Sequence, residues 1–160
     1  GEIIPYTESA DKLPAISKYY DYDEGAPGKS AQSNGITCIY RYAEVLLMYA
    51  EASTRATNSV NQDALNAIQE VQKRAGYQDR QIELTTTTEP TAFLTAVSNE
   101  RGWEFFAEMK RWFELVRLEK VKEVRAEEWD ASTFNTNHHY YFPVPYQQVD
   151  LAGWTNNAGY

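Results

Sequence analysis

The chain has 160 residues, 42% of them hydrophobic and 24% charged, which is enough for one domain with its own core and typical of a globular protein. Its formal net charge of −8 would repel a phosphate backbone and argues against nucleic-acid binding. No apolar run approaches the roughly 20 residues of a transmembrane helix, and the first residues lack the features of a secretory signal, so we expect a soluble chain.

Residues 1–38 are predicted to form a loop or extended arm, because proline and glycine interrupt them and no helical period appears. Cys38 is the single cysteine and cannot form an internal disulfide. Its apolar neighbours favour a buried structural thiol over a reactive one.

A strong helix is predicted over residues 39–56, where apolar residues recur at helical spacing and charged residues form only a narrow strip. Such a helix should be mostly surrounded by protein. The apolar stripe consists of Ile39, Tyr42, Val45, Leu46, Tyr49 and Ala50.

A second helix is predicted over residues 61–75, with Asn61 as its N-cap and Gly76 in the left-handed position after its end. Two antiparallel helices joined by a short loop form a hairpin. A single hairpin cannot bury its own outer face, so it must stack on something else.

A third helix should begin at Pro90, because proline suits the first helical position, and should run to about Ala107. A fourth amphipathic segment continues to about Val124, and the helical period alone does not decide whether a bend separates the two. Trp103 and Trp112 lie on these amphipathic helices and are expected in the core.

The tail from Trp129 to Tyr160 is rich in aromatic residues, asparagine and proline. Pro143 and Pro145 exclude a helix in their part of it. So many aromatic side chains would not stay solvated, and we therefore expect an ordered, irregular tail that wraps a helical core.

Three acidic residues recur at spacings of four positions and would share one helix face: Glu100, Glu104 and Glu108. A glycosidase needs two carboxylates about 5–9 Å apart across a cleft, which a single helical row does not supply. We therefore expect Glu104 and Arg101 to pair with each other and with Arg111 or Arg117, and so to tie two helices together.

Other chemistry has little support in the sequence. His138 and His139 are adjacent, so their side chains diverge, and no metal-ligand spacing occurs. No nucleophile has an evident base, and no glycine-rich phosphate loop is present. The sequence therefore predicts no catalytic residue, no metal site and no cofactor.

Aromatic side chains in non-helical segments are the candidates for stacking on sugar rings, with packing as their alternative use: Trp129, Trp154 and Tyr22.

Four stretches, taken in order, resemble one family. "YRYAEVLLMYAEA" at 40–52 looks like the SusD/RagB signature helix, and "ALNAIQEVQKRAG" at 64–76 resembles the helix that follows it. "NERGWEFFAEMKRWFELVRLEK" at 99–120 is similar to the family's segment ER-x-x-EF-x-x-E-G-x-RW-x-D-L-x-R. "YYFPVPYQQVD" and "NNAGY" are similar to its closing elements P-I-P and Q-N-P-G-Y. Four such matches in the right order over residues 40–160 make the resemblance specific.

The chain departs from the family pattern at three positions. Gly102 stands where the family often has a second arginine, Met109 where it usually has glycine, and Ala158 where the closing motif has proline. If position 109 is left-handed at a helix end, methionine is strained there by ~1 kcal/mol. Alternatively, the helix runs on through it.

The resemblance implies a mainly α fold of tetratricopeptide-like helix hairpins in an α/α superhelical arrangement, followed by the irregular tail. It assigns residues 39–160 to a C-terminal helical domain that follows the arm of residues 1–38. The matching motif positions are expected to be structural: Tyr42, Glu44, Glu51, Glu100, Arg101, Glu104, Arg111, Trp112, Pro143 and Pro145.

The resemblance further implies a cell-surface lipoprotein of a Gram-negative outer membrane. Such a protein binds a glycan or other nutrient, acts with a TonB-dependent, SusC-like transporter and does no chemistry; its lipid anchor belongs to the full-length protein. The family's glycan-binding residues lie largely in segments not present here, so none is carried over. Two alternatives stay open: a structural or protein-interaction fragment with no ligand site of its own, and an enzyme acting on a glycan, which rests on the acidic residues alone.

Overall fold

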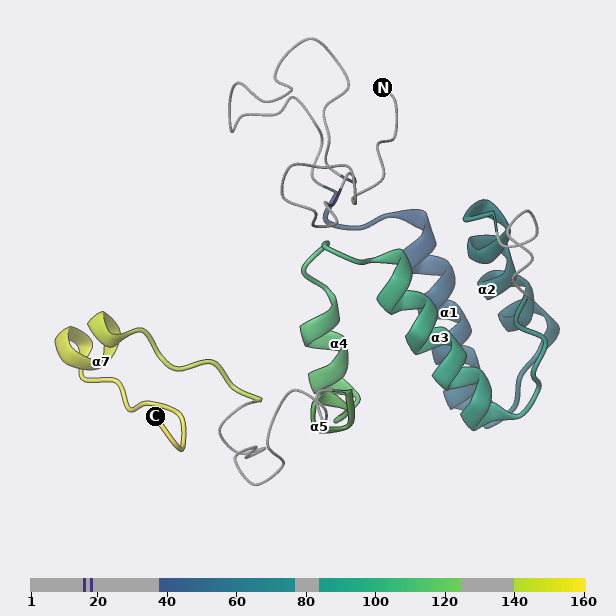
Figure 1. Cartoon of the computed structure of the whole chain (residues 1–160). Helices are drawn as coiled ribbons and strands as arrows, with labels where there is room; N and C mark the ends of the chain where they lie inside the picture. Colours follow the sequence, from purple (N-terminus) through teal and green to yellow (C-terminus); the bar gives the residue numbers. More distant parts are fainter. Residues whose placement is uncertain (1–15, 17, 19–37, 77–83, 125–139) are drawn as a thin grey trace, which may run out of the picture. The chain divides into compact units, whose positions relative to one another are not determined.

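The computed structural model describes five parts of the chain: residues 16, 18, 38–76, 84–124 and 140–160. These residues form six helices and no strand (Figure 1). The chain divides into two compact units, residues 1–108 and 109–160. The predicted domain boundary after residue 38 stays a prediction. Among the helices of the described residues, none is long and apolar enough to cross a membrane.

The first unit contains a helix hairpin. Helix α1 spans Tyr42–Thr57 and α2 spans Gln62–Arg74. The side-chain oxygen of Asn61 accepts a hydrogen bond of 2.7 Å from the backbone N–H of Ala64, which confirms the predicted N-cap. Gly76 follows α2 with a φ of 81°, in the left-handed region, as predicted.

Helix α3 spans Pro90–Glu104, with proline at its first position as predicted. The carboxylate of Glu89 caps the helix by accepting hydrogen bonds from the backbone N–H groups of Thr91, at 3.0 Å, and Ala92, at 2.6 Å. The bonds from Ala92 and Thr91 favour the ionised carboxylate and therefore lower the pKa of Glu89. A negative charge there also suits the positive end of the helix dipole.

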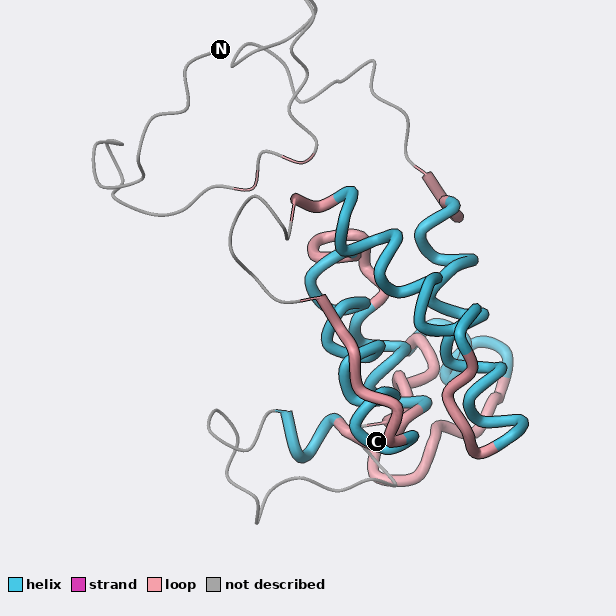
Figure 2. The backbone as a smooth tube through the Cα atoms, turned by 90° about the vertical axis from the view of Figure 1, so that its right-hand side faces the viewer, coloured by secondary structure: helices cyan, strands magenta, loops and turns pink. Residues whose placement is uncertain are grey.

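The three helices lie side by side, with α1 packed against both α2 and α3 (Figures 1 and 2). Arg41 at the start of α1 and Arg74 at the end of α2 both pair with Glu104 at the end of α3, so α1 runs antiparallel to the other two. This arrangement confirms the predicted helix hairpin. The core between the helices is apolar and buried: Leu47, Ala50, Ala64, Ala67, Ile68, Val71, Phe93, Val97 and Phe105.

The buried face of α1 is not the apolar stripe that the sequence predicted. Tyr42, Val45 and Tyr49 of that stripe are exposed, and Ile39 is exposed ahead of the helix. The side chains that α1 buries are Glu44, Leu47, Ala50, Glu51 and Thr54. Because α1 carries apolar residues on two faces, the helical period alone does not say which of them faces the core.

Two glutamates can lie on the buried face of α1 because each has a basic neighbour. The carboxylate of Glu51 accepts from Nε of Arg55 at 2.8 Å, one turn along the same helix. Glu44 lies 3.8 Å from Nη2 of Arg101 on α3. A buried carboxylate is tolerated when it is paired in this way.

Helix α3 ends at Glu104, three residues earlier than predicted, and a turn follows it. In this turn Ala107 and Met109 have φ values of 64° and 59°, both left-handed. The helix therefore does not run on through position 109, and the methionine occupies the strained conformation that glycine would adopt freely.

The second unit contains three short helices: α4 (Arg111–Arg117), α5 (Val121–Val124) and α7 (Tyr146–Ala152). The backbone N–H of Glu119 bonds to the carbonyl of Val116 at 3.1 Å, and that of Lys120 to the carbonyl of Leu115 at 2.8 Å. These bonds form a Schellman motif around Glu119, whose φ is 56°. The predicted fourth helix is therefore interrupted between α4 and α5.

Helix α7 corrects the prediction of a wholly irregular tail. Pro145 is its N-cap residue, and the helix begins at the next residue. Proline disrupts a helix interior but is tolerated at its start, where the missing N–H has no intrahelical acceptor. Gly153 ends the helix with a left-handed φ of 68°. Residues 129–139 of the predicted tail lie outside the described residues.

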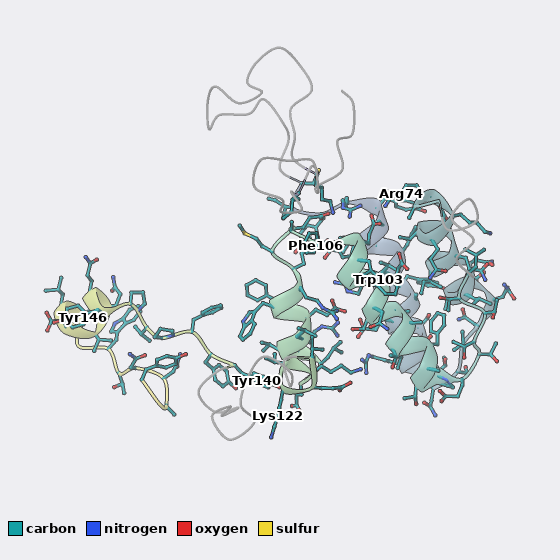
Figure 3. The ribbon with its side chains drawn as sticks, in the orientation of Figure 1. Arg74, Trp103, Phe106, Lys122, Tyr140 and Tyr146 are labelled. Carbon is teal, nitrogen blue, oxygen red and sulfur yellow. The ribbon has the colours of Figure 1, made fainter. Side chains whose placement is uncertain are left out.

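Two further predictions of burial are wrong. Trp103 is 64% exposed in the last turn of α3 (Figure 3), because its position is six residues from Val97 and so falls away from the helix face that meets the core. Cys38 is also exposed, since it precedes α1 and takes no part in its packing. Trp112 is half-buried, with its ring centroid 6.3 Å from that of Phe142.

Candidate functional site

Charged side chains gather where the start of α1 meets the end of α3. The guanidinium of Arg41 donates to the carboxylate of Glu108 from Nε, at 3.1 Å to each oxygen, and from Nη2 at 2.8 Å. It also donates to the carboxylate of Glu104 and, from Nη2 at 2.7 Å, to the backbone carbonyl oxygen of Glu104. One guanidinium thus holds two acidic side chains and a helix-terminal carbonyl, and the hydrogen bonds to the carboxylates are charge-assisted.

Two further cations reach the same acids. Arg74 lies at the end of α2 (Figure 3) and pairs with Glu104, and Lys18 pairs with Glu108. The Nζ of Lys18 also donates to the backbone carbonyls of Glu104, at 2.7 Å, and Phe106, at 3.3 Å. Cations at these carbonyls suit the negative end of the α3 dipole. We call these residues the charged cluster: Lys18, Arg41, Arg74, Glu104 and Glu108.

The buried ring of Phe105 lies beside the charged cluster. The guanidinium carbon of Arg41 is 4.8 Å from the ring centroid, and that of Arg101 is 5.3 Å from it. Both distances are within the range of cation–π attraction. The aromatic ring therefore adds a second contact between α3 and the residue that precedes α1.

The charged residues join helices through partners other than those expected from the sequence. Glu104 was expected to pair with Arg101 and with a basic residue of the following segment, but it pairs with Arg41 and Arg74. Arg101 instead lies near Glu44 of α1. Of the two expected basic residues, Arg111 pairs with Glu114 of its own helix at 3.2 Å.

The charged cluster keeps the carboxylate of Glu108 ionised. Burial alone would raise the pKa of Glu108, but the hydrogen bonds and charges of Arg41 and Lys18 outweigh burial and lower it. Burial would likewise lower the pKa of Arg41, whereas Glu108 and Glu104 raise it. A carboxylate held ionised in this way is unsuited to donate a proton to a leaving group, as a glycosidase acid must. The geometry and charge of the charged cluster therefore suit a structural role, in which its side chains hold the ends of the helices together.

A buried glutamine connects α2 to the segment before α3, which the sequence did not indicate. The side chain of Gln72 accepts from the backbone N–H of Thr85 and donates to its hydroxyl, both at 2.9 Å. The same amide lies 3.2 Å from the carboxylate of Glu100, which is only 1% exposed. Gln69 donates to the carbonyl of Thr85 at 2.8 Å. The one feature of the sequence that could have indicated this connection is the position of Gln72, next to Val71 on the apolar face of α2.

The C-terminal segment folds back on itself by hydrogen bonds. Asn156 accepts from the backbone N–H of Val144 at 2.8 Å, and Asn157 donates to the carbonyl of Phe142 at 2.5 Å. Within the loop that these bonds close, Trp154 is 59% exposed. An exposed indole on a hydrogen-bonded loop presents a flat apolar surface of the kind on which sugar rings stack.

The remaining predicted site residues are only partly covered by the structure. Trp129, Tyr22, His138 and His139 lie outside the described residues. Within the described ranges, no group of three histidine, cysteine, aspartate or glutamate side chains is placed to hold a metal ion. Of the three predicted carbohydrate-binding candidates, only Trp154 therefore lies within the described residues.

A helix hairpin packed on a third helix, with charged side chains that join the helix ends, defines a tetratricopeptide-like α-helical protein. The sequence model of the SusD family matches residues 5–160, and the chain belongs to that family. Family membership confirms the resemblance drawn from the four sequence stretches.

Two curated relatives and two solved structures are similar to this chain. SusD-like proteins P2 and P25 of Formosa agariphila are 28% and 27% identical to it, over 100% and 87% of this chain and 34% and 26% of their own lengths. A SusD superfamily protein from Parabacteroides distasonis matches 81% of this chain with a TM-score of 0.68 and 29% identity. A SusD homolog from Bacteroides thetaiotaomicron matches 76% with a TM-score of 0.64 and 29% identity. The matches cover 28% and 26% of those two chains, so this chain spans about a third or less of the length of its relatives.

Proposed function

We propose that this chain is the C-terminal part of the glycan- or nutrient-binding component of an outer-membrane polysaccharide uptake system. The whole protein would be lipid-anchored on the cell-surface side of the outer membrane, act with a TonB-dependent transporter and catalyse no reaction. The observation that carries the proposal is the match to the SusD family over residues 5–160. The ion-paired state of Glu104 and Glu108 supports a binding role over a hydrolytic one, because neither acid is placed as a proton donor.

Binding and hydrolysis can be separated with the full-length protein and a panel of soluble polysaccharides. In native affinity gels the protein should be retarded by at least one polysaccharide. The same polysaccharide should keep its chain length after prolonged incubation with the protein. Reducing sugar released in proportion to protein concentration would contradict the proposal and favour the enzymatic alternative. Purification of the protein from outer membranes should recover a TonB-dependent transporter with it.

A finer proposal concerns Trp154, with Trp129 and Tyr22 as further candidates for contact with the glycan. The exposure of Trp154 on a hydrogen-bonded loop supports its role. Trp154→Ala should weaken the affinity for the glycan about tenfold if the indole stacks on a sugar ring. Leu151→Ala is the control, because Leu151 is an exposed apolar residue without an aromatic ring, at the end of α7 and three positions before Trp154. Equal affinities for Trp154→Ala and the unmodified protein would remove the residue from the site.

A second candidate function is that of a scaffold, in which this chain has no ligand site of its own. The charged cluster and the Gln72 contacts favour it, because these polar groups of the first unit serve to join its helices. Isothermal titration of the 160-residue chain beside the full-length protein distinguishes the two candidates. Binding by the full-length protein alone favours the scaffold, whereas binding by both favours a site within this chain.

A further inference from the structure

The C-terminal segment, residues 140–160, exposes aromatic rings on a backbone that hydrogen bonds hold in place. Besides Trp154, it exposes Tyr146, which is 77% accessible at the start of α7 (Figure 3). The backbone N–H of Trp154 donates to the carbonyl of Gln148 in α7 at 3.3 Å, so the residue that carries the indole is tied to the helix. A backbone held in this way lowers the conformational cost of binding a ligand to the two rings.

The exposed polar side chains next to these aromatic residues in the sequence are uncharged amides and a hydroxyl: Gln147, Gln148 and Thr155. Amides and hydroxyls both donate and accept hydrogen bonds, as the hydroxyl groups of a sugar also do. Carboxylate and sulfate groups are instead bound by arginine or lysine through charge-assisted bonds. The sequence of residues 140–160 contains neither, and Asp150 on α7 is the only charged side chain within this range.

The charge of this part of the chain opposes an anionic ligand. Asp150 is exposed four positions before Trp154. Residues 126–160 contain four acidic residues and no lysine or arginine, and the whole chain has a formal net charge of −8. A carboxylate or sulfate brought to the C-terminal segment would lose water without gaining a cation from it. The net charge of the chain would also repel a polyanion at long range. A neutral glycan incurs neither cost.

We propose that the glycan bound at the C-terminal segment is neutral and carries no uronic acid, sulfate or phosphate group. The inference rests on the proposed function, with Trp154 as a contact of the glycan. The apolar face of a sugar ring lies on the indole, and the sugar hydroxyls bond to the uncharged amides and hydroxyl of the segment.

Affinity measurements on the full-length protein with matched polysaccharides test this inference. Amylose, laminarin and mannan are the neutral probes, and alginate and polygalacturonate are the anionic ones. The backbone that binds is then compared as its hydroxyethyl and carboxymethyl derivatives, which differ in charge but little in size. The hydroxyethyl derivative should bind at least about tenfold more tightly at low salt. Its affinity should change less than about twofold between 0.01 M and 1 M NaCl, over which the Debye length falls from about 30 Å to about 3 Å.

Two charge reversals test whether the C-terminal segment makes this discrimination. Asp150→Lys and Glu70→Lys change the net charge of the protein equally, but Glu70 is exposed on α2 in the first unit. Only Asp150→Lys should raise the affinity for the carboxymethyl derivative, by about threefold at low salt. Both variants should keep the affinity for the hydroxyethyl derivative within about twofold.

Each of the other outcomes overturns the inference. Tighter binding of alginate or polygalacturonate than of any neutral polysaccharide would do so and leave the proposed function standing, as would equal affinities for the two derivatives. Equal effects of the two charge reversals would assign the discrimination to the net charge of the protein. An unchanged affinity of Trp154→Ala for the neutral polysaccharide would place the glycan elsewhere. Failure to bind any polysaccharide would remove the proposed function and this inference with it.

Discussion

The Nη2 atom of Arg41 lies 2.7 Å from the backbone carbonyl oxygen of Glu104, which joins the residue before α1 to the last residue of α3. The same guanidinium binds the side chains of Glu104 and Glu108. Arg41→Gln should therefore lower the free energy of unfolding by about 2 kcal/mol, because two partly buried carboxylates lose their shared partner. Urea unfolding followed by circular dichroism at 222 nm measures the change.

Lys73→Gln is the control for Arg41→Gln. Lys73 is an exposed basic residue in the last turn of α2. Its replacement should change the free energy of unfolding by roughly 0.5 kcal/mol or less. If the two substitutions destabilise the protein equally, Arg41 is not the residue that holds α1 to α3.

The lowered pKa of Glu108 predicts how stability changes in acid. Because Arg41 and Lys18 lower the pKa of Glu108 in the folded protein, its contribution to stability is complete above the unfolded pKa of about 4.3. The contribution is lost as pH falls through the folded pKa, where the carboxylate takes up a proton. Glu108→Gln should destabilise the protein at pH 7 and flatten the fall in melting temperature between about pH 5 and pH 2.

Glu123→Gln serves as the control for the pH measurement, since Glu123 is exposed on α5. This variant should keep the acid dependence of the unmodified protein. An unchanged slope in Glu108→Gln, with a changed slope in Glu123→Gln, would contradict the assignment of the acid-sensitive charge to the charged cluster.

The helix hairpin could be predicted from the sequence because its signals are local. Asn61 before α2, Gly76 after it and Pro90 at the start of α3 each act on backbone groups within a few residues. Such signals identify where helices begin and end. They do not identify which side of α1 faces the core, because that depends on α2 and α3 and on the pairing of Glu44 and Glu51.

The charged cluster could not be predicted, because it joins residues that lie far apart along the chain. Arg41 and Glu104 are 63 positions apart, and Lys18 and Glu104 are 86 apart. Helical spacing relates residues only three or four positions apart, which is why Glu104 was expected to pair with its neighbour Arg101. Of the charged cluster, the family resemblance predicted a structural role for Glu104 alone, and it did not supply the partners of Glu104.

Met109 provides a test of backbone strain. Its φ of 59° is left-handed, a conformation that costs a residue with a Cβ roughly 1 kcal/mol more than glycine. Met109 is also exposed, so its side chain contributes little packing. Met109→Gly should raise the free energy of unfolding by about 0.5 kcal/mol, after the extra entropy of glycine in the unfolded chain is deducted. Differential scanning calorimetry should show a higher melting temperature.

Asn99→Gly is the opposite control for Met109→Gly. Asn99 is exposed in the interior of α3, where glycine has ordinary helical geometry and only its entropic cost. This substitution should lower stability by a few tenths of a kcal/mol. The strain at position 109 is disproved if both glycine substitutions destabilise the protein.

The amide of Gln72 should determine whether the segment before α3 stays attached to α2. Gln72→Leu keeps the approximate volume of the side chain but removes the partners of the Thr85 N–H and hydroxyl and one partner of the buried Glu100 carboxylate. The variant should lose about 2–3 kcal/mol of stability, because buried polar groups lose their hydrogen bonds. Hydrogen exchange at the Thr85 amide should accelerate more than exchange within α1, since the segment opens locally.

Gln62→Leu is the control, because Gln62 is exposed and bonds only to Asn66 of its own helix. A Gln72→Leu variant with native exchange at Thr85 would show that Gln69, which binds the Thr85 carbonyl at 2.8 Å, holds the segment by itself.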